Sequence, residues 1–402
     1  MKKIKSIFGI IKREIDWIIN DLDLIAMLLA APLFYSFFYG TMYINKIETE
    51  VPVAVYDEDR SYDSYQFIKD LNANALINVK FNINNPDEIK DKLINEDVQG
   101  VIYIPKNFSS DLKYNRSVSV KAFLNTHRFL HSNDLNKAIN EVALNKSEQI
   151  RIQYFNSKNF SNDQAKQLST PLKDETRLLF NPSESYGDFL IPAILVLVFQ
   201  QTLFMGLGQS MAKENELKKL NELKMLSASD PVYSLIGKAG FYLILYLSYA
   251  LLFFSVHLAV FKIPFNGSYI AFFLMTLLLL ISISSIAIII GSFFTKKVHA
   301  LILISFTTYP LFFFTGYSWP KFSMPLIAKM IGYLIPTTPY LQSLNRILLM
   351  GADLKHIIPE ILNILLLTII YFLLAVFILK KNSTGKKFLL NIFLIAIEYF
   401  LM

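Results

Sequence analysis

Hydrophobic residues along this chain gather in six long runs, separated by polar stretches. The runs cover residues 24–43, 189–211, 235–261, 269–294, 300–317 and 357–379. A helix needs about 20 apolar residues to cross roughly 30 Å of hydrocarbon, and only helices or closed barrels satisfy every backbone group there. The pattern therefore predicts a polytopic α-helical membrane protein with six membrane-spanning helices.

The polar block at residues 45–185 has a different pattern. VPVAVYDED at 51–59 and VQGVIYI at 98–104 are typical of strands, and the stretches between them of helices. Asn85-Pro86-Asp87 favours a helix start, and residues 132–167 have helical spacing. We predict an inserted extracytoplasmic α/β domain on a helical stalk.

Three further segments are amphipathic or broken. Residues 1–23 carry apolar side chains at helical spacing, which favours a helix on the membrane surface over a soluble surface helix. Prolines break residues 319–350, so short helices that re-enter the outer leaflet are expected there. The apolar end, 381–402, is short for a span and is interpreted as a C-terminal interfacial segment.

The composition indicates that part of the chain lies in lipid and part in water, and the distribution of basic residues predicts how the chain is oriented in the membrane. The chain of 402 residues is 53% hydrophobic, with a mean hydropathy of +0.39, which is too apolar for a soluble protein. Lys and Arg concentrate before the first span, between spans two and three and spans four and five, and after the sixth. The positive-inside rule therefore places both termini in the cytoplasm and residues 45–185 outside.

Several classes of chemistry are disfavoured. The net charge of +7 comes from basic residues beside apolar runs, not from one continuous stripe, so no nucleic-acid partner is expected. The chain has no Cys, which excludes disulfides and thiol chemistry. The first apolar run lacks the features of a cleaved signal, so we expect an uncleaved span.

Candidate catalytic motifs are scarce. Gly237-Lys238 lacks the earlier Gly and the Ser or Thr of a phosphate-binding loop, so no nucleotide or other cofactor is expected in this chain. His127 and His131 stand four residues apart and could share a metal, but surface histidines explain them better. We expect no catalytic residue and no metal site.

The stretch at residues 212–230, between the second and third spans, is too long and too helical for a simple turn. Its leucine stripe fits either a helix lying on the bilayer or one docked in a groove of a soluble partner. The stripe consists of Leu217, Leu220, Leu223 and Leu226.

Polar or aromatic side chains within spans are candidates for a substrate path, because unpaired polar groups facing lipid are costly. Gln200, Gln201, His257 and Tyr309 qualify. Hydrogen bonds between helices of one subunit explain them as well.

Several separate segments together resemble the permease subunits of type-2 ABC exporters, specifically the drug-efflux-like subgroup with a large outside domain after the first span. They are VPVAVYDEDRS at 51–61, VQGVIYIPKNFSSDL at 98–112 and FFTGYSWPKFSMP at 313–325. In the cytoplasmic loop, Glu214, Glu216, Leu223 and Gly237-Lys238 match, while Lys218-Lys219 replaces the usual Gly-Thr.

This resemblance implies a permease half-transporter of the bacterial inner membrane. It would dimerise with itself or with a sibling permease, bind cytoplasmic ABC ATPase subunits that hold ATP and Mg, and export a small hydrophobic or amphipathic substrate, drug-like or lipid-like. A periplasmic adaptor protein is a further expected partner. The residues that would couple to the ATPase are Glu214, Glu216, Leu217, Leu220, Leu223 and Leu226.

The alternative is a membrane-anchored receptor, scaffold or enzyme that acts through the outside domain. Six spans with a broken outer region favour a transport pathway instead.

The sequence predicts five segments along the chain. They are an interfacial helix at 1–23, the first span at 24–44, the α/β domain with its helical stalk at 45–185, a five-helix bundle at 186–380 and the interfacial segment at 381–402. The bundle includes the coupling helix at 212–230 and the re-entrant outer region at 319–350.

Overall fold

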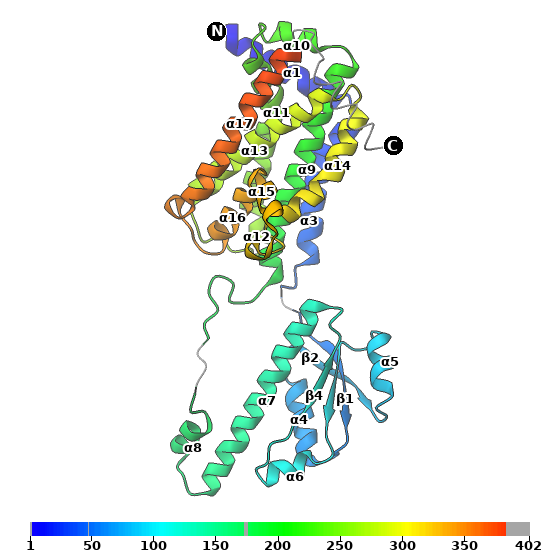
Figure 1. The fold of residues 1–402 in the computed structure, drawn as a ribbon, viewed down its shortest axis with the longest axis vertical. Coiled ribbons are helices and arrows are strands. Elements are labelled where there is room, and N and C mark those ends of the chain that lie inside the picture. The colour runs from blue at the N-terminus through cyan, green and yellow to red at the C-terminus, as the bar shows by residue number, and fades with distance from the viewer. Residues whose placement is uncertain (1, 47, 173–175, 383–402) are drawn as a thin grey trace. The chain divides into compact units, whose positions relative to one another are not determined.

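The computed structural model describes residues 2–46, 48–172 and 176–382. The chain divides into two compact units, which we call the helical unit (Met1–Lys46 and Leu179–Met402) and the α/β unit (Ile47–Leu178). The predicted fold class, a helical membrane protein with an inserted α/β domain, is confirmed (Figure 1). The segment predicted to be interfacial at 381–402 falls almost wholly outside the described residues.

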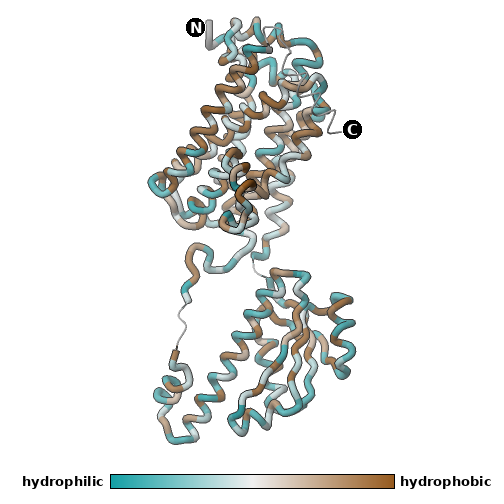
Figure 2. The backbone as a smooth tube through the Cα atoms, viewed as in Figure 1, coloured by the Kyte–Doolittle hydropathy of each residue, from teal (hydrophilic) through white to brown (hydrophobic). Residues whose placement is uncertain are grey.

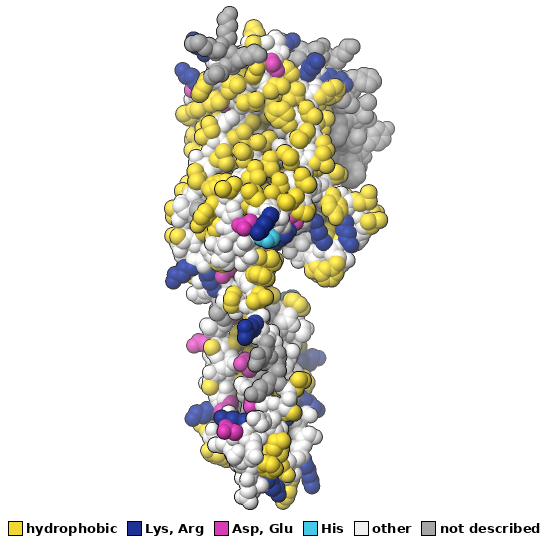
Figure 3. Space-filling view, turned by 90° about the vertical axis from the view of Figure 1, so that its left-hand side faces the viewer, with side chains coloured by type: hydrophobic (Ala, Val, Ile, Leu, Met, Phe, Trp, Pro, Cys, Tyr) yellow, Lys and Arg dark blue, Asp and Glu magenta, His cyan; other side chains and the backbone are white. Residues whose placement is uncertain are grey.

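Six helices of the described chain are long and apolar enough to span a membrane, in agreement with the sequence. They cover Leu22–Met42, Tyr186–Glu216, Pro231–Val260, Tyr269–Phe293, Lys297–Phe314 and Leu354–Lys381. Residues of high hydropathy run through the middle of the helical unit (Figure 2). On the face drawn in Figure 3, hydrophobic side chains form a broad band with basic side chains toward its ends. This distribution matches an apolar slab bounded by water on both sides.

The helical unit begins with α1 and a first span that contains a π-helical turn. A second π-helical turn interrupts the third span. The elements are α1 (Lys2–Ile19), α2 (Leu22–Ile25), η1 (Ala26–Ala30), α3 (Ala31–Met42), α9 (Tyr186–Glu216), α10 (Leu220–Leu226), α11 (Pro231–Leu252), η2 (Phe253–His257), α12 (Leu258–Val260), α13 (Tyr269–Phe293), α14 (Lys297–Phe314), η3 (Lys321–Ser323), α15 (Leu326–Tyr333), α16 (Thr337–Leu348), η4 (Leu354–Ile357) and α17 (Ile358–Asn382).

Helices α9 and α13 form the centre of the helical unit. Both are largely buried, and α13 also packs against α11 and α17, while α14 packs against α9. At Gly291 of α13 a Cβ atom would collide with the carbonyl oxygen of Gly208 on α9. The two backbones approach this closely because neither position carries a side chain, as is common between membrane helices.

The outer region at 319–350 contains short helices, as the prolines predict. Helix α15 has eight residues and α16 has twelve, too few to cross a bilayer. Helix α16 is largely buried, whereas Leu326 and Ile327 of α15 are exposed. The region therefore folds back on the bundle at the end opposite α10 (Figure 1).

The prediction of one continuous helix at 212–230 is wrong. Helix α9 runs on to Glu216, the chain turns, and the separate helix α10 follows. Lys218 has φ of +56°, a left-handed conformation that a continuous helix does not contain.

The α/β unit is a four-stranded sheet with helices on both faces. The strand order is β2-β1-β3-β4, with β1 parallel to β2 and β3, and β4 antiparallel to β3. Its elements are β1 (Val51–Asp57), α4 (Tyr62–Asn72), β2 (Ile77–Ile83), α5 (Glu88–Ile94), β3 (Gly100–Ile104), α6 (Phe108–Lys113), β4 (Lys121–Leu124), α7 (Phe129–Ser157) and α8 (Asn162–Ser169).

The two predicted strands are the two inner strands, β1 and β3. The outer strands β2 and β4 were not predicted. The alternation of apolar and polar residues along β2 (INVKFNI) was an available strand signal, whereas β4 has only four residues. The main core joins one face of the sheet to α4 and α7, through Val53, Ile102, Phe67 and Leu135. A smaller core on the other face includes Ile89 and Leu93 of α5.

Candidate functional site

Four charged side chains from three helices meet inside the helical unit, and we call them the ion cluster. They are Arg13 and Glu14 of α1, Glu214 of α9 and Lys238 of α11. The Nζ atom of Lys238 lies 2.6 Å from Oε1 of Glu14 and 3.0 Å from Oε1 of Glu214. The guanidinium of Arg13 also bonds to Glu214. The cluster therefore ties α1 to α9 and α11.

The ion cluster is almost completely shielded from solvent. The side chains of Glu14 and Glu214 are 0% exposed, that of Lys238 is 1% exposed and that of Arg13 is 11% exposed. The two buried carboxylates face two cations, and the carboxylate of the partly exposed Glu222 lies 3.7 Å from the Arg13 guanidinium. Burying four charges is costly, and removing one partner would leave an uncompensated charge that costs more.

Ser210 and Trp17 complete the surroundings of the ion cluster. The hydroxyl of Ser210 donates to Oε2 of Glu14 at 2.6 Å, and Nζ of Lys238 lies 3.1 Å from the same hydroxyl. The Trp17 ring lies 4.9 Å from the guanidinium carbon of Arg13 and 5.2 Å from Nζ of Lys238. The face of an aromatic ring attracts cations, so Trp17 adds to the stabilisation of Arg13 and Lys238.

Asp21, just after α1, makes a second ionic link. Its Oδ2 lies 3.0 Å from Nζ of Lys213 and 3.4 Å from Nζ of Lys297. Burial alone would raise the pKa of the Asp21 carboxyl, but the hydrogen bond and charge of Lys213, helped by Lys297, lower it overall. Asp21 therefore stays charged and connects the start of the first span with α9 and α14.

The end of α9 is tied to two further helices. The side-chain amide of Asn215 donates to the carbonyl oxygens of Phe294 at 2.9 Å and Ser292 at 3.2 Å, at the end of α13. The carboxylate of Glu216 accepts from the backbone N–H of Lys297 at 2.9 Å, at the start of α14. Both bonds satisfy backbone groups that a helix terminus leaves unpaired.

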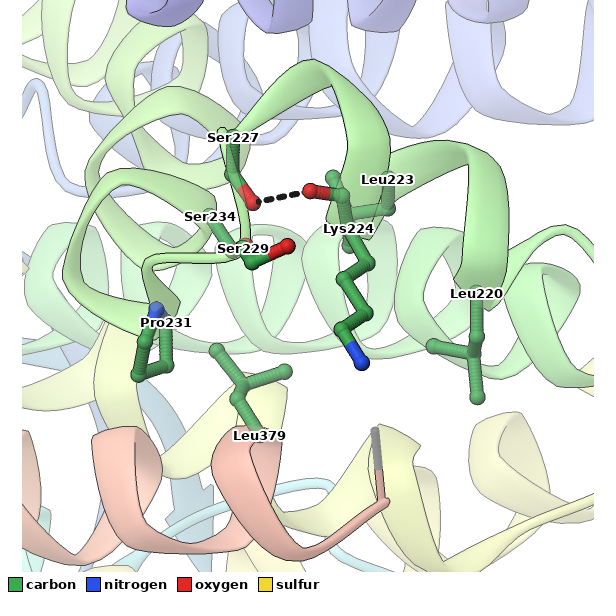
Figure 4. Close-up of a pocket in the computed structure, with 8 residues that line it drawn as sticks. All are labelled: Leu220, Leu223, Lys224, Ser227, Ser229, Pro231, Ser234 and Leu379. Carbon is green, nitrogen blue, oxygen red and sulfur yellow. Dashed lines mark hydrogen bonds between the residues drawn. The ribbon is translucent and has the colours of Figure 1, made fainter. Parts of the chain in front are cut away.

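Helix α10 lies against the ends of α11 and α17. Between these helices lies a small hollow of about 30 Å³, which is large enough only for water. Leu379 of α17 points toward it (Figure 4). Leu223 is buried against this packing, at 2% exposure. Met225, 75% exposed, lies on the outer side of the same helix.

The structure separates the predicted coupling residues into three sets by their exposure. Glu214 and Leu223 are buried, with Glu214 inside the ion cluster, while Leu220 and Leu226 are half-buried. Glu216 and Leu217 are exposed at the turn between α9 and α10. The four leucines therefore do not make one outward stripe, because the turn at Lys218 changes the helix direction after Leu217.

Sequence reasoning missed Arg13, Glu14 and Ser210 as members of this site. One signal was available: Glu14 lies among the apolar positions of the first helix, and Lys238 lies at the start of an otherwise apolar span. A charge in such a position needs a partner of opposite sign.

Of the predicted path residues, Gln200 lines a cavity of about 240 Å³ between α9, α13, α14 and the outer helices. Its side chain is 3% exposed and accepts a hydrogen bond from the hydroxyl of Thr337. The other lining residues are mostly Ile, Leu and Phe, with Thr307 and Tyr371 as further polar members. The cavity is apolar with a few polar groups, as small-molecule pockets are.

The other three predicted path residues do not line this cavity. His257 is fully buried, with Nε2 2.9 Å from the carbonyl oxygen of Ser36, and its ring centroid lies 4.5 Å from that of Phe261, with the two rings tilted by 48°. Gln201 is half-buried and Tyr309 is 58% exposed on α14. His257 thus connects the first and third spans. This agrees with the alternative explanation, in which such polar residues form hydrogen bonds between helices of one subunit.

Among the described residues, no group of three or more His, Cys, Asp or Glu side chains is arranged to hold a metal ion. His131 faces Glu48, with 3.4 Å between Nε2 and Oε1. The surface interpretation of this histidine agrees with that pairing.

Comparison with known proteins identifies the family to which this chain is similar. The family model described as ABC-2 family transporter protein matches residues 23–377. The chain is 22% identical over 323 residues to the probable multidrug ABC transporter permease YbhR of Escherichia coli K12, covering 80% of this chain and 83% of YbhR. It is 21% identical over 390 residues to the inner membrane transport permease YhhJ of the same organism, covering 95% and 99%. It is also 21% identical over 332 residues to the probable multidrug permease YbhS, covering 82% and 84%.

Proposed function

The chain belongs to the ABC-2 transporter family, and from this premise we propose that it exports a small hydrophobic or amphipathic substrate, driven by a separate ATPase subunit. As an ABC permease it is an integral protein of the inner membrane and the transport half of the complex. ATP and Mg bind to the partner ATPase. The substrate, drug-like or lipid-like, leaves the cytoplasm or the inner leaflet.

The observation that carries the coupling mechanism is the convergence of five helices at one end of the helical unit. Helices α1, α9, α11 and α14 are joined there by the ion cluster, Asp21 and the bond of Glu216. Helix α10 joins them through Glu222, whose Oε1 lies 3.7 Å from Nη1 of Arg13 on α1. A partner that displaces α10 would therefore move α1 and α9 with it. Such displacement yields work only if the partner binds the two arrangements with different free energies.

This end of the helical unit is proposed to face the cytoplasm. Basic side chains concentrate in α1, around α10, at the start of α14 and at the end of α17, as the positive-inside rule requires. The α/β unit is then exported, where a periplasmic adaptor protein could bind it. The exposed Leu217, Glu216 and Met225 would contact the ATPase, whereas Glu214 and Leu223 would transmit the force internally.

The substrate path is proposed to run along the surface between two permease copies, or between this chain and a sibling permease. The cavity beside Gln200 supports an apolar substrate, because its walls are mainly aliphatic and its few polar groups can orient a ligand. The exposed Tyr309 on α14 remains a candidate for the seam between copies.

The test is reconstitution of the chain in vesicles with the ATPase that co-purifies with it. Met225→Asp places a charge in the proposed interface and should weaken ATPase binding by about 2 kcal/mol or more, roughly 30-fold. Export should fall in parallel. Met350→Asp, at a residue of similar exposure after α16, is the matched control and should leave both unchanged. Equal ATPase binding by both variants would refute the docking surface, and export without any ATPase would refute the proposed function.

A further inference from the structure

The α/β unit contains a groove of about 500 Å³ that the transport proposal does not use. It lies where the second half of α7 passes α4, α6 and the loop before β4. Its lining residues all belong to the α/β unit. This volume falls within the range of about 300–1,000 Å³ typical of small-molecule sites.

The floor of the groove is apolar and rigid. Phe67 of α4 and Phe108 of α6 are buried, with their ring centroids 5.7 Å apart. Leu112, Val118 and Val120 pack beside them on the main core of the unit. A hydrocarbon chain placed on this floor would lose contact with water along its length, which is favourable.

The rim of the groove is basic. It carries Arg116, Lys146 and Arg151. Lys146 is neutralised by Asp70, with 2.7 Å between Nζ and Oδ2. Within the described part of the chain, no carboxylate pairs with the guanidinium of Arg116, which lies over the Tyr114 ring, or with that of Arg151. Two cations therefore remain available beside an apolar floor.

In this unit, the carboxylates at the usual ligand position of a parallel sheet bond to groups of the chain itself. Ligands of such sheets bind outside the carboxyl ends of the strands, where the strand order reverses, here at β1 and β3. At that edge the carboxylate of Asp57 accepts from the backbone N–H groups of Asp59 and Arg60 and from the hydroxyl of Ser64. Asp63 accepts from the hydroxyl of Ser109. These carboxylates are thus engaged by groups of the chain itself, whereas the groove beside α7 has cations without a carboxylate partner among the described residues.

We propose that this groove binds a single-chain amphipathic carboxylate, a fatty acid or a molecule of that shape. The acyl chain lies on Phe67 and Phe108, and the carboxylate bonds to Arg116 and Arg151, whose planar groups match it well. The groove is too small for a two-chain phospholipid. This assignment goes beyond transport, because binding needs neither the ATPase nor a second permease.

The test uses the full-length chain in nanodiscs and a dodecanoic acid that carries a photoreactive diazirine near its methyl end. After irradiation, peptides are mapped by mass spectrometry, so binding in the groove is distinguished from binding between the membrane helices. The methyl ester of the same probe tests the charge, and a diacyl phosphatidic acid probe tests the lipid headgroup as the source. The expected result is labelling of residues 108–120 and 143–151 by the free acid above both other probes.

Removing the cations should abolish most of this labelling. Arg116→Gln with Arg151→Gln should lower it about tenfold or more, since each charge-assisted bond contributes at least a few-fold in affinity. Lys90→Gln with Lys158→Gln removes two exposed lysines of the same unit and should change nothing. Ser119→Trp keeps both arginines but fills the groove, and should also lower labelling.

Three outcomes of the acid-probe experiments would overturn the proposal, and a fourth comes from the phosphatidic acid probe. They are equal labelling by acid and ester, labelling unchanged in both the arginine and the Ser119→Trp variants, and labelled peptides confined to the helical unit. Stronger labelling by the phosphatidic acid probe would also refute it, by assigning the groove to a membrane headgroup.

Discussion

The ammonium group of Lys238 on α11 lies 2.6 Å from the carboxylate of Glu14 on α1, with both side chains at 1% exposure or less. The two residues are 224 positions apart. The first helix is therefore an integral part of the bundle, held by a buried charge pair as well as by apolar contact.

Lys238→Met should destabilise the protein by about 3–5 kcal/mol, because Glu14 and Glu214 would lose a buried cation. The double variant Lys238→Met with Glu14→Gln leaves one carboxylate facing Arg13, so it should recover a large part of this loss. The measurement is the unfolding midpoint of the full chain in nanodiscs. A single variant as stable as the wild type would show that the ion cluster contributes nothing to folding.

Gly237 tests the contact between α1 and α11. A Cβ atom at this position would lie 2.8 Å from Cβ of Ile10, so Gly237→Ala should cost about 1–3 kcal/mol by forcing the two helices apart. Gly9→Ala is the matched control, since nothing lies within 4 Å of a Cβ there, and it should stabilise by about 1 kcal/mol through helix propensity. Both are read from the same thermal unfolding experiment. Opposite signs for the two alanines are the expected result; stabilisation by both would contradict the close approach.

The cavity beside Gln200 gives a prediction for transport. Thr307→Trp would fill most of the 240 Å³, so export should fall about tenfold or more while ATPase binding persists. Leu373→Trp, at a residue 60% exposed on α17, is the control. Substrate flux and bound ATPase are measured in the same vesicles. Full export by Thr307→Trp would exclude the cavity from the path.

Glu58 predicts how the α/β unit responds to pH. Its carboxylate accepts hydrogen bonds from the hydroxyls of Tyr103 and Tyr56, each at 2.8 Å, and these bonds lower the pKa of Glu58 below its ordinary 4.5. A lowered folded-state pKa adds stability above pH 4.5, and this is lost as the pH falls through the folded value. The same bonds raise the pKa of both tyrosines above 10.0, so their contribution is present below pH 10 and lost at higher pH.

Limited proteolysis of the full chain at several pH values measures this effect. The wild type should become more susceptible within the α/β unit below pH 4.5 than at pH 6. Glu58→Gln should remove that difference and leave cleavage in the helical unit unchanged. An identical acid response in both proteins would show that Glu58 does not couple stability to pH.

The spans and the inner strands could be predicted from the sequence, because each is defined by the pattern of a short continuous stretch of residues. Helix α13 is a run of apolar residues, and β1 and β3 are rich in Val and Ile. The sequence was insufficient for Glu214, which the family resemblance assigned to coupling with the ATPase and which the structure buries in the ion cluster. Its partners Arg13 and Lys238 belong to distant segments, and only the packing of α1 on α11 brings them within reach.

The break at Lys218 was also beyond the sequence. A leucine every three residues from 217 to 226 favours one helix, and lysine itself has a good helix propensity. The left-handed turn forms because tertiary contacts decide: Asn215 and Glu216 are held by α13 and α14, and α10 must pack on α17.

Helix α9 is a single rod of 31 residues, roughly 46 Å long. One tip holds Glu214, Asn215 and Glu216, and the other begins at Tyr186, where the chain arrives from the α/β unit. Pro192 removes one backbone hydrogen bond near the Tyr186 end of α9, and the turns after it continue without another proline to Glu216. A tilt imposed at Glu214 is therefore carried along most of the length of the helix. A single helix thus connects the end of the bundle that holds the ion cluster with the end at which the chain enters from the α/β unit.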